Sequence, residues 1–323
     1  MVTGGAGFIG SHLVERLLSD GHEVHVFDWI PLEQARNLEA ARSHAAFNYT
    51  QGDIRNAQDV GRFFRPEATA IYHLASTVGV HLYMEDPLSL IDIAIFGLRH
   101  IVNCALEHGT RLIFSSTSEI YGKNPAIPWL ESADRVLGHS GLDRWSYSSS
   151  KAVCEHIVNA VHRHKGLPTT IVRFFNAYGP RQNSFYVVSQ SVYKVLRGER
   201  PFLYDSGTQT RCFTFVDDIV GGLIACLQED RAVGETFNLG NPVEISIGDV
   251  IKIVIEEACS DIEPLHFDTN KEFGEVYEDV PRRVPAIEKA KSLLNWLPVT
   301  NLRSGIGQTI SWARDNPWWL ADR

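Results

Sequence analysis

The chain is poor in sulfur-containing residues. Among its 323 residues there are 5 cysteines and 2 methionines. The cysteines, Cys104, Cys154, Cys212, Cys226 and Cys259, are scattered and show no Cys-x-x-Cys spacing. An odd number of isolated cysteines is typical of reduced side chains in a cytoplasmic protein, not of a disulfide framework or a zinc site. We therefore expect a cytoplasmic location and no bound metal.

The chain also has no excess of positive charge and no apolar run that approaches the length of a membrane span. Its formal net charge is −9. Neither nucleic acid nor an anionic membrane attracts such a surface, so both are excluded as general partners. An anionic small-molecule substrate would then need arginines gathered locally.

Glycine is concentrated at the start of the sequence, at Gly4, Gly7 and Gly10. Glycines at this spacing let the backbone turn tightly after a strand and let a diphosphate approach the main chain. The helix expected from Ser11 to Ser19 would direct its free N–H groups at that diphosphate. Only Met1 and Val2 precede Thr3, so either upstream residues are missing, which we favour, or the first strand is unusually short.

An acidic residue, Asp28, ends the second apolar run, Val24–Asp28. A carboxylate at this position can accept hydrogen bonds from both ribose hydroxyls of an adenosine. Trp29, Ile30 and Pro31 follow, with no arginine or lysine to meet a 2′-phosphate. Together with the glycines, this pattern predicts a dinucleotide site that prefers NAD to NADP.

Strand and helix patterns alternate through the first half. Short β-rich runs lie at Ala70–Leu74, Arg111–Ser115 and Thr169–Phe174, with helical stretches at Leu88–His108 and Ser149–His164. This alternation predicts an α/β fold with a Rossmann-like, doubly wound parallel sheet.

After Gly179-Pro180 the alternation breaks. A helix is expected at Val187–Arg197, Phe213–Val216 and Thr236–Leu239 would return to the sheet region, and helices dominate beyond Asn241. The predicted organisation is an NAD-binding domain of residues 1–180 and 212–240, interwoven with a smaller, mainly helical nucleotide-sugar-binding region of residues 181–211 and 241–323.

Tyr147 and Lys151 lie four residues apart near the start of a predicted helix and so share one face. An ammonium beside a phenol lowers the phenol's pKa, which lets Tyr147 act as a base, and Lys151 could also hold the nicotinamide ribose. Alone, this spacing is more often a surface helix pair. Joined to the N-terminal glycines and Asp28, it is the main catalytic candidate.

These motifs resemble the extended short-chain dehydrogenase/reductases that modify nucleotide sugars, and the resemblance spans nearly the whole chain. It is carried by Thr3–His12, Gly52–Ile54, His73–Ser76, Tyr147 with Lys151, Arg173–Arg181 and Arg211–Phe213.

The resemblance implies tightly held NAD and transient oxidation of the sugar at carbon 4. Tyr147 would take the hydroxyl proton while Thr117 hydrogen-bonds the same oxygen. Asn176 would bind substrate, or alternatively fix a buried turn. The cofactor residues it implies are Gly4, Gly7, Phe8, Ile9, Gly10, Asp28, Asp53, Ile54, Leu74, Ala75, Ser76, Tyr147 and Lys151, and the substrate residues are Asn176, Arg181, Arg211 and Arg283.

The sub-family depends on Thr117-Ser118-Glu119. The 4,6-dehydratases carry Thr-Asp-Glu here, and a serine is too weak an acid to replace that aspartate. Simple 4-epimerases carry small neutral residues at the last two positions. Thr-Ser-Glu resembles the UDP-glucuronate decarboxylases, including UDP-xylose synthases, the aminoarabinose-pathway decarboxylase and UDP-apiose synthases. Supporting stretches are Arg144–Tyr147, Arg211–Thr214, Tyr277–Arg283 and Glu288–Trp296.

The chemistry agrees with a decarboxylase. Once carbon 4 is a ketone, the carboxylate at carbon 6 belongs to a β-keto acid and can leave as carbon dioxide. Thr117 and Ser118 could stabilise the resulting enolate, and Glu119 with Arg283 could steer the carboxylate and a proton. Alternatively, Glu119 caps backbone and Arg283 binds the diphosphate, for which Arg211 is the better candidate.

We expect decarboxylation of UDP-glucuronate. The alternatives are a 4-epimerase or 4,6-dehydratase and, more remotely, a non-catalytic NAD-binding sensor.

Two positions depart from the family pattern or leave a choice open. Ala94 stands where many members have an asparagine that binds a relay water, and either Arg282 or Arg283 could face the substrate. The helix after residue 88 carries an apolar face that predicts a homodimer, in which this helix and the helix with Tyr147 and Lys151 pack against their symmetry mates; burial inside the monomer is the alternative. That face comprises Leu90, Ile91, Ala94, Ile95 and Leu98.

Overall fold

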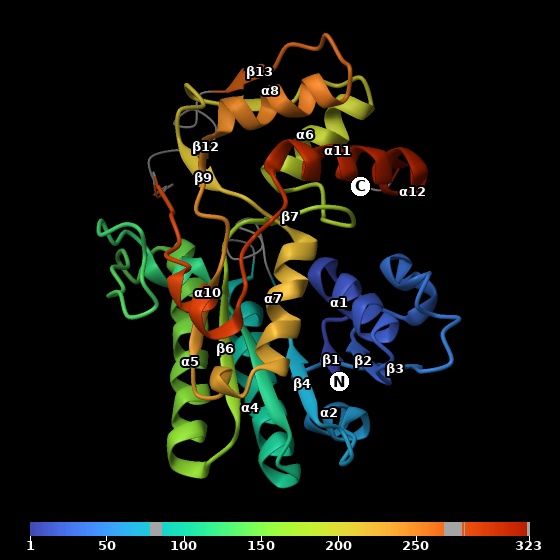
Figure 1. The fold of residues 1–323 in the computed structure, drawn as a ribbon, viewed down its shortest axis with the longest axis vertical. Coiled ribbons are helices and arrows are strands. Elements are labelled where there is room, and N and C mark those ends of the chain that lie inside the picture. Colours follow the sequence, from blue (N-terminus) through green and yellow to red (C-terminus); the bar gives the residue numbers. More distant parts are fainter. Residues whose placement is uncertain (78–85, 268–279, 281, 322–323) are drawn as a thin grey trace.

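A single parallel sheet organises the chain (Figure 1). The computed structural model describes residues 1–77, 86–267, 280 and 282–321. Its seven-stranded sheet has the order β11-β6-β5-β4-β1-β2-β3, and every neighbouring pair is parallel. The predicted Rossmann-like sheet is confirmed. The strands are β1 (Val2–Thr3), β2 (Val24–Asp28), β3 (Phe47–Gln51), β4 (Ala70–His73), β5 (Arg111–Thr117), β6 (Thr169–Phe174) and β11 (Thr236–Leu239).

Helices cover both faces of the sheet, because successive strand residues point to opposite sides. In β4, Ile71 and Tyr72 are both buried but belong to two different apolar clusters. Helices α1 and α7 pack on one side, and α2, α4 and α5 on the other. These helices are α1 (Phe8–Ser19), α2 (Ala57–Phe63), α4 (Pro87–His108), α5 (Ser146–Lys165) and α7 (Val216–Gln228).

The strand order reverses between β1 and β4. In open α/β sheets this reversal creates a crevice at the carboxyl ends of the strands, where ligands bind. The loops after β1, β4 and β5 therefore meet at one place, and they carry the glycines, Leu74–Ser76 and Thr117–Glu119.

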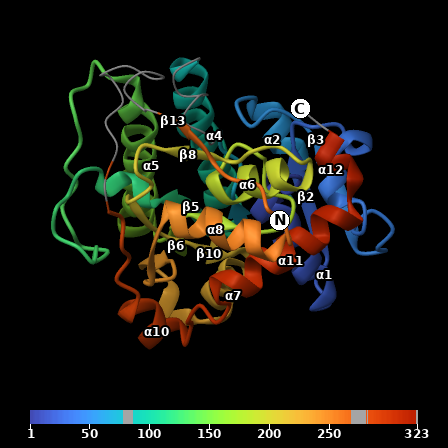
Figure 2. The same ribbon diagram turned by 90° about the horizontal axis from the view of Figure 1, so that it is seen from above.

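Several elements from the second half of the sequence build a further layer beyond the carboxyl ends of the strands. Helices α6, α8 and α11 pack against one another there (Figure 2). Two small sheets accompany them, pairing β8 with β13 and β9 with β12. The elements are α6 (Val187–Leu196), α8 (Ile247–Glu257), α11 (Leu302–Asp315), α12 (Pro317–Ala321), β8 (Phe202–Tyr204), β9 (Thr210–Cys212), β12 (Glu244–Ser246) and β13 (Leu265–Phe267).

One predicted strand joins a different sheet. The region expected at 213–216 forms β10 (Thr214–Phe215), which pairs with β7 (Ala177–Tyr178) outside the main sheet. Asn176, which has a positive φ of 23°, lies between β6 and β7. Helix α10 (Glu288–Leu294) packs on β11 and α7, although the sequence assigned it to the substrate-binding region. The two-domain division stays a prediction.

Contrary to the expectation from the sequence that no apolar run approaches the length of a membrane span, helix α4 is long and apolar enough to cross a membrane by length and composition. It packs instead along α5 and β5. Leu90, Ala94 and Leu98 are buried within the monomer. The sequence analysis predicted that these three residues form part of a dimer face. For these residues the prediction is wrong, because the sheet and α5 already cover them.

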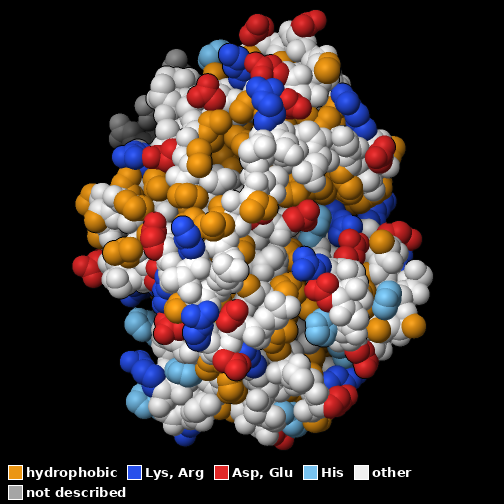
Figure 3. Space-filling model, viewed as in Figure 1, with side chains coloured by type: hydrophobic (Ala, Val, Ile, Leu, Met, Phe, Trp, Pro, Cys, Tyr) orange, Lys and Arg blue, Asp and Glu red, His pale blue; other side chains and the backbone are white. Residues whose placement is uncertain are grey.

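The loop of residues 123–143 packs through its Trp129, which stacks on Tyr121 with ring centroids 4.9 Å apart. Figure 3 shows apolar side chains gathered over this loop, at the left of the view, where Leu130 and Val136 are exposed. The loop thereby covers the outer side of the turn that follows β5.

Candidate active site

The glycine-rich loop has no room for side chains at two of its glycines. Gly4 has a φ of +71°, and a Cβ there would lie 2.7 Å from the backbone nitrogen of Ala75. A Cβ on Gly10 would lie 2.1 Å from the carbonyl oxygen of Gly4. Helix α1 begins at Phe8, so Phe8, Ile9 and Gly10 form its first turn and do not precede it as predicted. Its N-cap, Gly7, provides no side-chain cap, which leaves first-turn N–H groups for an anion.

Asp28 lies against this loop. Its Oδ2 accepts a hydrogen bond from the backbone N–H of Ala6 at 3.0 Å, and its Oδ1 accepts one from Ile30 at 3.4 Å. Burial raises the pKa of Asp28, and the backbone hydrogen bonds oppose that effect. A tight glycine turn, an uncapped helix N-terminus and an adjacent carboxylate fit the diphosphate and ribose of NAD.

The other predicted cofactor residues lie on two turns. Ala75, between Leu74 and Ser76, donates from its backbone N–H to Thr3 Oγ1 at 3.3 Å, which fixes this turn beside the glycine loop. Ile54 is buried beneath α4, where a Cβ on Gly97 would approach it to 2.9 Å. The carboxylate of Asp53 forms an ion pair with Arg55 at 2.6 Å.

Tyr147 and Lys151 are both buried, which excludes the alternative of a solvated surface pair. Helix α5 begins at Ser146, so Tyr147 lies in its first turn. Lys151 Nζ donates to the carbonyl oxygen of Ser115 at 2.8 Å and lies 4.9 Å from the ring centroid of Phe114. Burial lowers the pKa of Lys151 to about 8, against the raising effects of nearby acidic groups.

The Thr117-Ser118-Glu119 motif forms the junction between β5 and the short 3-10 turn η3 (Ser118–Tyr121). Thr117 Oγ1 accepts a hydrogen bond from the backbone N–H of Glu119 at 3.2 Å and so caps the turn. Helix α5 packs on η3, which brings the tyrosine–lysine helix and this motif together.

Glu119 lies between two arginines. Its Oε2 accepts from Arg144 Nη2 at 2.7 Å, and its Oε1 accepts from Arg283 Nη1. Burial disfavours the ionised form, but Arg283 and Arg144 outweigh it and lower the pKa of Glu119 to about 2. Both of its oxygens bind guanidinium groups, which favours ion pairing over the alternative that this carboxylate caps backbone.

Two guanidinium groups meet one carboxylate in this cluster. Arg144 is buried, and among the described residues its Nε and Nη1 have no hydrogen-bond partner. Its guanidinium lies 5.0 Å from the ring centroid of Trp145, and the Lys123 ammonium lies 5.7 Å from the same ring. A buried cation without its full set of partners is costly, so the cluster suits an anionic group of a substrate.

Sequence reasoning did not name Arg144 as a site residue. The only signal was its position in the Arg144–Tyr147 stretch, just before the helix that carries Tyr147 and Lys151. A contact with Glu119 across the fold cannot be read from that position.

The structure resolves which of the two adjacent arginines faces the Glu119 cluster. Arg283 is buried against Glu119, whereas Arg282 is exposed and its Nε donates to Glu244 Oε1 at 2.9 Å. Of the predicted supporting stretch, Tyr277–Asp279 and Pro281 lie outside the described residues.

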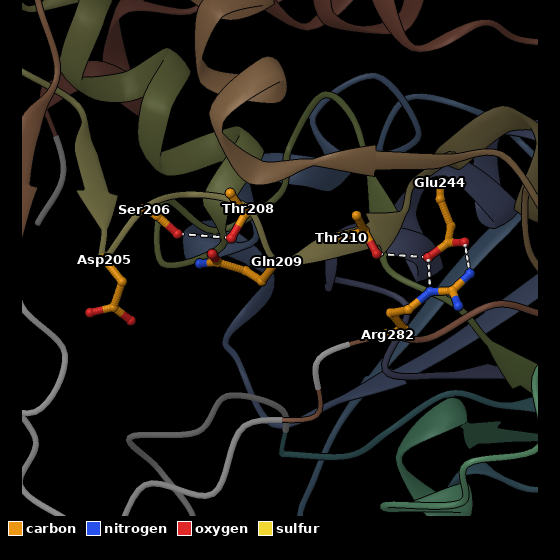
Figure 4. Close-up of a pocket in the computed structure, with 7 residues that line it drawn as sticks. All are labelled: Asp205, Ser206, Thr208, Gln209, Thr210, Glu244 and Arg282. Carbon is orange, nitrogen blue, oxygen red and sulfur yellow. Dashed lines mark hydrogen bonds and ion pairs between the residues drawn. The ribbon is translucent and has the colours of Figure 1, made fainter.

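Arg282 and Glu244 border a polar pocket (Figure 4). None of the predicted catalytic residues lines it, and Arg211 follows one of its lining residues, Thr210, on β9. It therefore lies in the predicted substrate-binding region and apart from the catalytic cluster. Its lining residues are Asp205, Ser206, Thr208, Gln209, Thr210, Glu244 and Arg282.

The other predicted substrate residues have partners elsewhere. Asn176 Nδ2 donates to the carbonyl oxygen of Cys212 at 3.1 Å, which favours the turn-fixing alternative. Arg181 donates to both carboxylate oxygens of Glu15 on α1, at 2.7 and 2.8 Å. Arg211 Nη1 donates to the carbonyl oxygen of Thr210 at 2.8 Å. Of the four predicted substrate residues, only Arg283 has a described contact with the Thr117–Glu119 turn.

The search for metal-ligand clusters, confined to the residues that the structure describes, finds no group of three or more His, Cys, Asp or Glu side chains that could hold a metal ion.

The parallel sheet, the glycine loop with Asp28, and the buried Tyr147 and Lys151 on one helix define an extended short-chain dehydrogenase/reductase. More narrowly, the chain belongs to the GDP-mannose 4,6-dehydratase family, whose model matches residues 1–309.

Two relatives with named activities match almost the whole chain. A UDP-N-acetyl-alpha-D-glucosaminuronate decarboxylase of Bacillus cytotoxicus is 34% identical, over 98% of this chain and 97% of the relative. UDP-glucuronic acid decarboxylase 1 of Xenopus tropicalis is 35% identical, over 97% of this chain and 72% of the relative.

Solved structures share the fold over the same length. An epimerase of Methanothermobacter thermautotrophicus superposes with a TM-score of 0.90 at 25% identity, covering 99% of this chain and 93% of its own. A double mutant of a dTDP-glucose 4,6-dehydratase from Streptomyces venezuelae, solved with NAD bound, has a TM-score of 0.87 at 27% identity, covering 98% and 97%.

Proposed function

We propose that this protein is an NAD-dependent decarboxylase of UDP-glucuronate that works through a transient ketone at carbon 4. The observation that carries the proposal is the ionised Glu119 held between Arg144 and Arg283, directly after Thr117 and Ser118. The relatives named as decarboxylases match nearly the whole chain and support the same conclusion.

The first step oxidises carbon 4. NAD, when bound, accepts the hydride from this carbon. Tyr147 accepts the proton of the carbon 4 hydroxyl and must be ionised to do so. The buried ammonium of Lys151 favours this phenolate form of Tyr147. Thr117, at the end of β5, donates a hydrogen bond to the same oxygen.

The second step removes carbon dioxide. The guanidinium groups of Arg144 and Arg283 bind the carboxylate at carbon 6. The bond between carbons 5 and 6 breaks, its electron pair moves toward the carbon 4 carbonyl to give an enolate, and carbon dioxide leaves. Thr117 and Ser118 donate hydrogen bonds to the enolate oxygen. Ser118 supplies no acid for the dehydration that a 4,6-dehydratase performs.

A second substrate is UDP-N-acetylglucosaminuronate, because the Bacillus cytotoxicus relative is named for it. The two sugars share the carboxylate at carbon 6 and differ at carbon 2. The arrangement that we assign to the site, in which Glu119 holds the guanidinium groups of Arg144 and Arg283 and these bind the carboxylate, is the same for both.

Mass spectrometry of the products from a panel of UDP-glucuronate, UDP-N-acetylglucosaminuronate and UDP-glucose tests the function. We expect loss of carbon dioxide from a uronate. Loss of water from the hexose would indicate a dehydratase, and an unchanged mass with a new stereoisomer would indicate an epimerase. NAD binding without any product would indicate a sensor.

We further propose a cytoplasmic homodimer. Apolar side chains remain exposed on α4 and α5, with Leu88 74%, Phe96 54% and Val153 44% exposed. Helices α4 and α5 pack side by side. A two-fold interface that pairs both helices with their symmetry mates would cover these side chains.

A further inference from the structure

Two chain segments must meet for Glu119 to contact Arg283. One is η3, which contains Glu119. The other is the segment 283–287, which begins at Arg283, 164 positions after Glu119. The second segment is held by Trp129 of the loop 123–143. Trp129 donates from its backbone N–H to Val284 at 2.8 Å, and its carbonyl oxygen accepts from Ala286 at 3.0 Å.

Asn238 of β11 joins the two segments. It is completely buried. Its Oδ1 accepts from the hydroxyl of Tyr121, the last residue of η3, at 2.7 Å. Its Nδ2 donates to the carbonyl oxygens of Trp129 at 2.8 Å and Ala286 at 3.2 Å. One side chain thus binds the end of the turn that carries Glu119 and the segment that carries Arg283.

Tyr121 has a second partner, which links the same cluster to the catalytic helix. Its hydroxyl oxygen accepts from Arg173 Nη1 at 2.7 Å. Arg173 in turn donates to both carboxylate oxygens of Glu155, at 2.9 and 2.6 Å. Glu155 lies one helical turn after Lys151 on α5. In a buried, low-dielectric setting such a satisfied chain of hydrogen bonds is rigid.

We infer that Tyr121 and Asn238 are positioning residues that set how Glu119 meets Arg283, and so control the decarboxylation step. The inference rests on the proposed function. We expect Tyr121 and Asn238 to affect oxidation much less than decarboxylation, because Lys151 is held by the carbonyl oxygen of Ser115 and not by their hydrogen bonds. Stacking on Trp129 keeps the Tyr121 ring in place, so the hydroxyl can be removed with the ring retained.

The test is Tyr121→Phe, with Tyr72→Phe as the matched control. Tyr72 is also buried, and its hydroxyl donates to the carbonyl oxygen of Leu223 at 3.2 Å, away from Glu119. Two rates are measured on UDP-glucuronate in a single turnover, the appearance of reduced nicotinamide and the release of carbon dioxide. Melting temperatures are recorded alongside.

In Tyr121→Phe we expect oxidation within about twofold of the wild type and carbon dioxide release slowed roughly tenfold or more, because small misplacements of reacting groups are costly. The ketone acid then accumulates. Tyr72→Phe should leave the ratio of the two rates unchanged even if its melting temperature falls. Asn238→Ala removes all three bonds and should give the same split, which provides a second test if Tyr121→Phe fails to fold.

Two results would overturn the inference and leave the proposed function intact. One is an equal ratio of the two rates in Tyr121→Phe and Tyr72→Phe. The other is an equal fall of oxidation and carbon dioxide release in Tyr121→Phe. A wild-type protein that releases no carbon dioxide from UDP-glucuronate would refute the proposed function, and the inference with it.

Discussion

Replacing Glu119 with glutamine removes the negative charge from a buried cluster of two arginines. The amide has the same size and keeps one acceptor oxygen, but its NH2 group faces a guanidinium that also donates. Arg144 and Arg283 then lie close together without the carboxylate that both of them bind. We expect Glu119→Gln to destabilise the fold and to slow carbon dioxide release per folded molecule, while NAD binding persists.

The size of the destabilisation follows from the pKa. Glu119 is held at a pKa of about 2, against an ordinary 4.5. At about 1.4 kcal/mol per pKa unit, this contributes roughly 3 kcal/mol at neutral pH. Breaking a buried ion pair costs about the same, roughly 3–5 kcal/mol. Because the folded pKa is depressed, the contribution is complete above pH 4.5 and is lost as the pH falls toward 2.

Urea unfolding of the wild type and Glu119→Gln, at neutral pH and across the acid range, measures this difference. The control is Glu15→Gln, which removes a carboxylate from the partly exposed pair with Arg181 and should cost under about 1 kcal/mol. The reasoning is refuted if Glu119→Gln unfolds like the control and releases carbon dioxide at the wild-type rate per folded molecule.

Four further outcomes are expected. Because we assign Asp28 to the adenosine ribose, NAD should bind far more tightly than NADP in titration, and equal affinities would contradict this. Tyr147→Phe should bind cofactor normally and lose roughly a hundredfold to ten-thousandfold in oxidation, as removal of a general base does, whereas wild-type turnover would exclude the role. The pKa of Lys151 is lowered to about 8, so its ammonium is present below that pH and lost above it. The oxidation rate should therefore fall as the pH rises through 8. A rate that stays flat from pH 8 to 10.5, the ordinary lysine pKa, would argue against a role for the ammonium. Phe96→Glu with Val153→Glu should convert a dimer to a monomer in light scattering, and a monomeric wild type would refute the dimer.

Local sequence patterns predicted most of the sheet because its strands are buried, apolar and separated by long helices. The bounds of β6 and β11 agree with the expected Thr169–Phe174 and Thr236–Leu239. The pattern at 213–216 indicated a strand but could not indicate its partner, because β10 pairs with β7, which lies far away in the sequence.

The site was predictable where one motif carries it, as in the glycine loop, Tyr147 with Lys151 and Thr117–Glu119. It was not predictable where distant segments meet. The apolar face of α4 illustrates the same limit, because its periodicity is the same whether the monomer or a second subunit covers it.

Release of label from UDP-glucuronate labelled at carbon 6 tests the central claim most directly. With wild-type protein and NAD, the label should leave as carbon dioxide, in step with the appearance of a nucleotide sugar that has lost one carbon. If the substrate is converted and the label stays in the nucleotide sugar, the protein is not a decarboxylase, and the role we assign to Glu119, Arg144 and Arg283 is wrong.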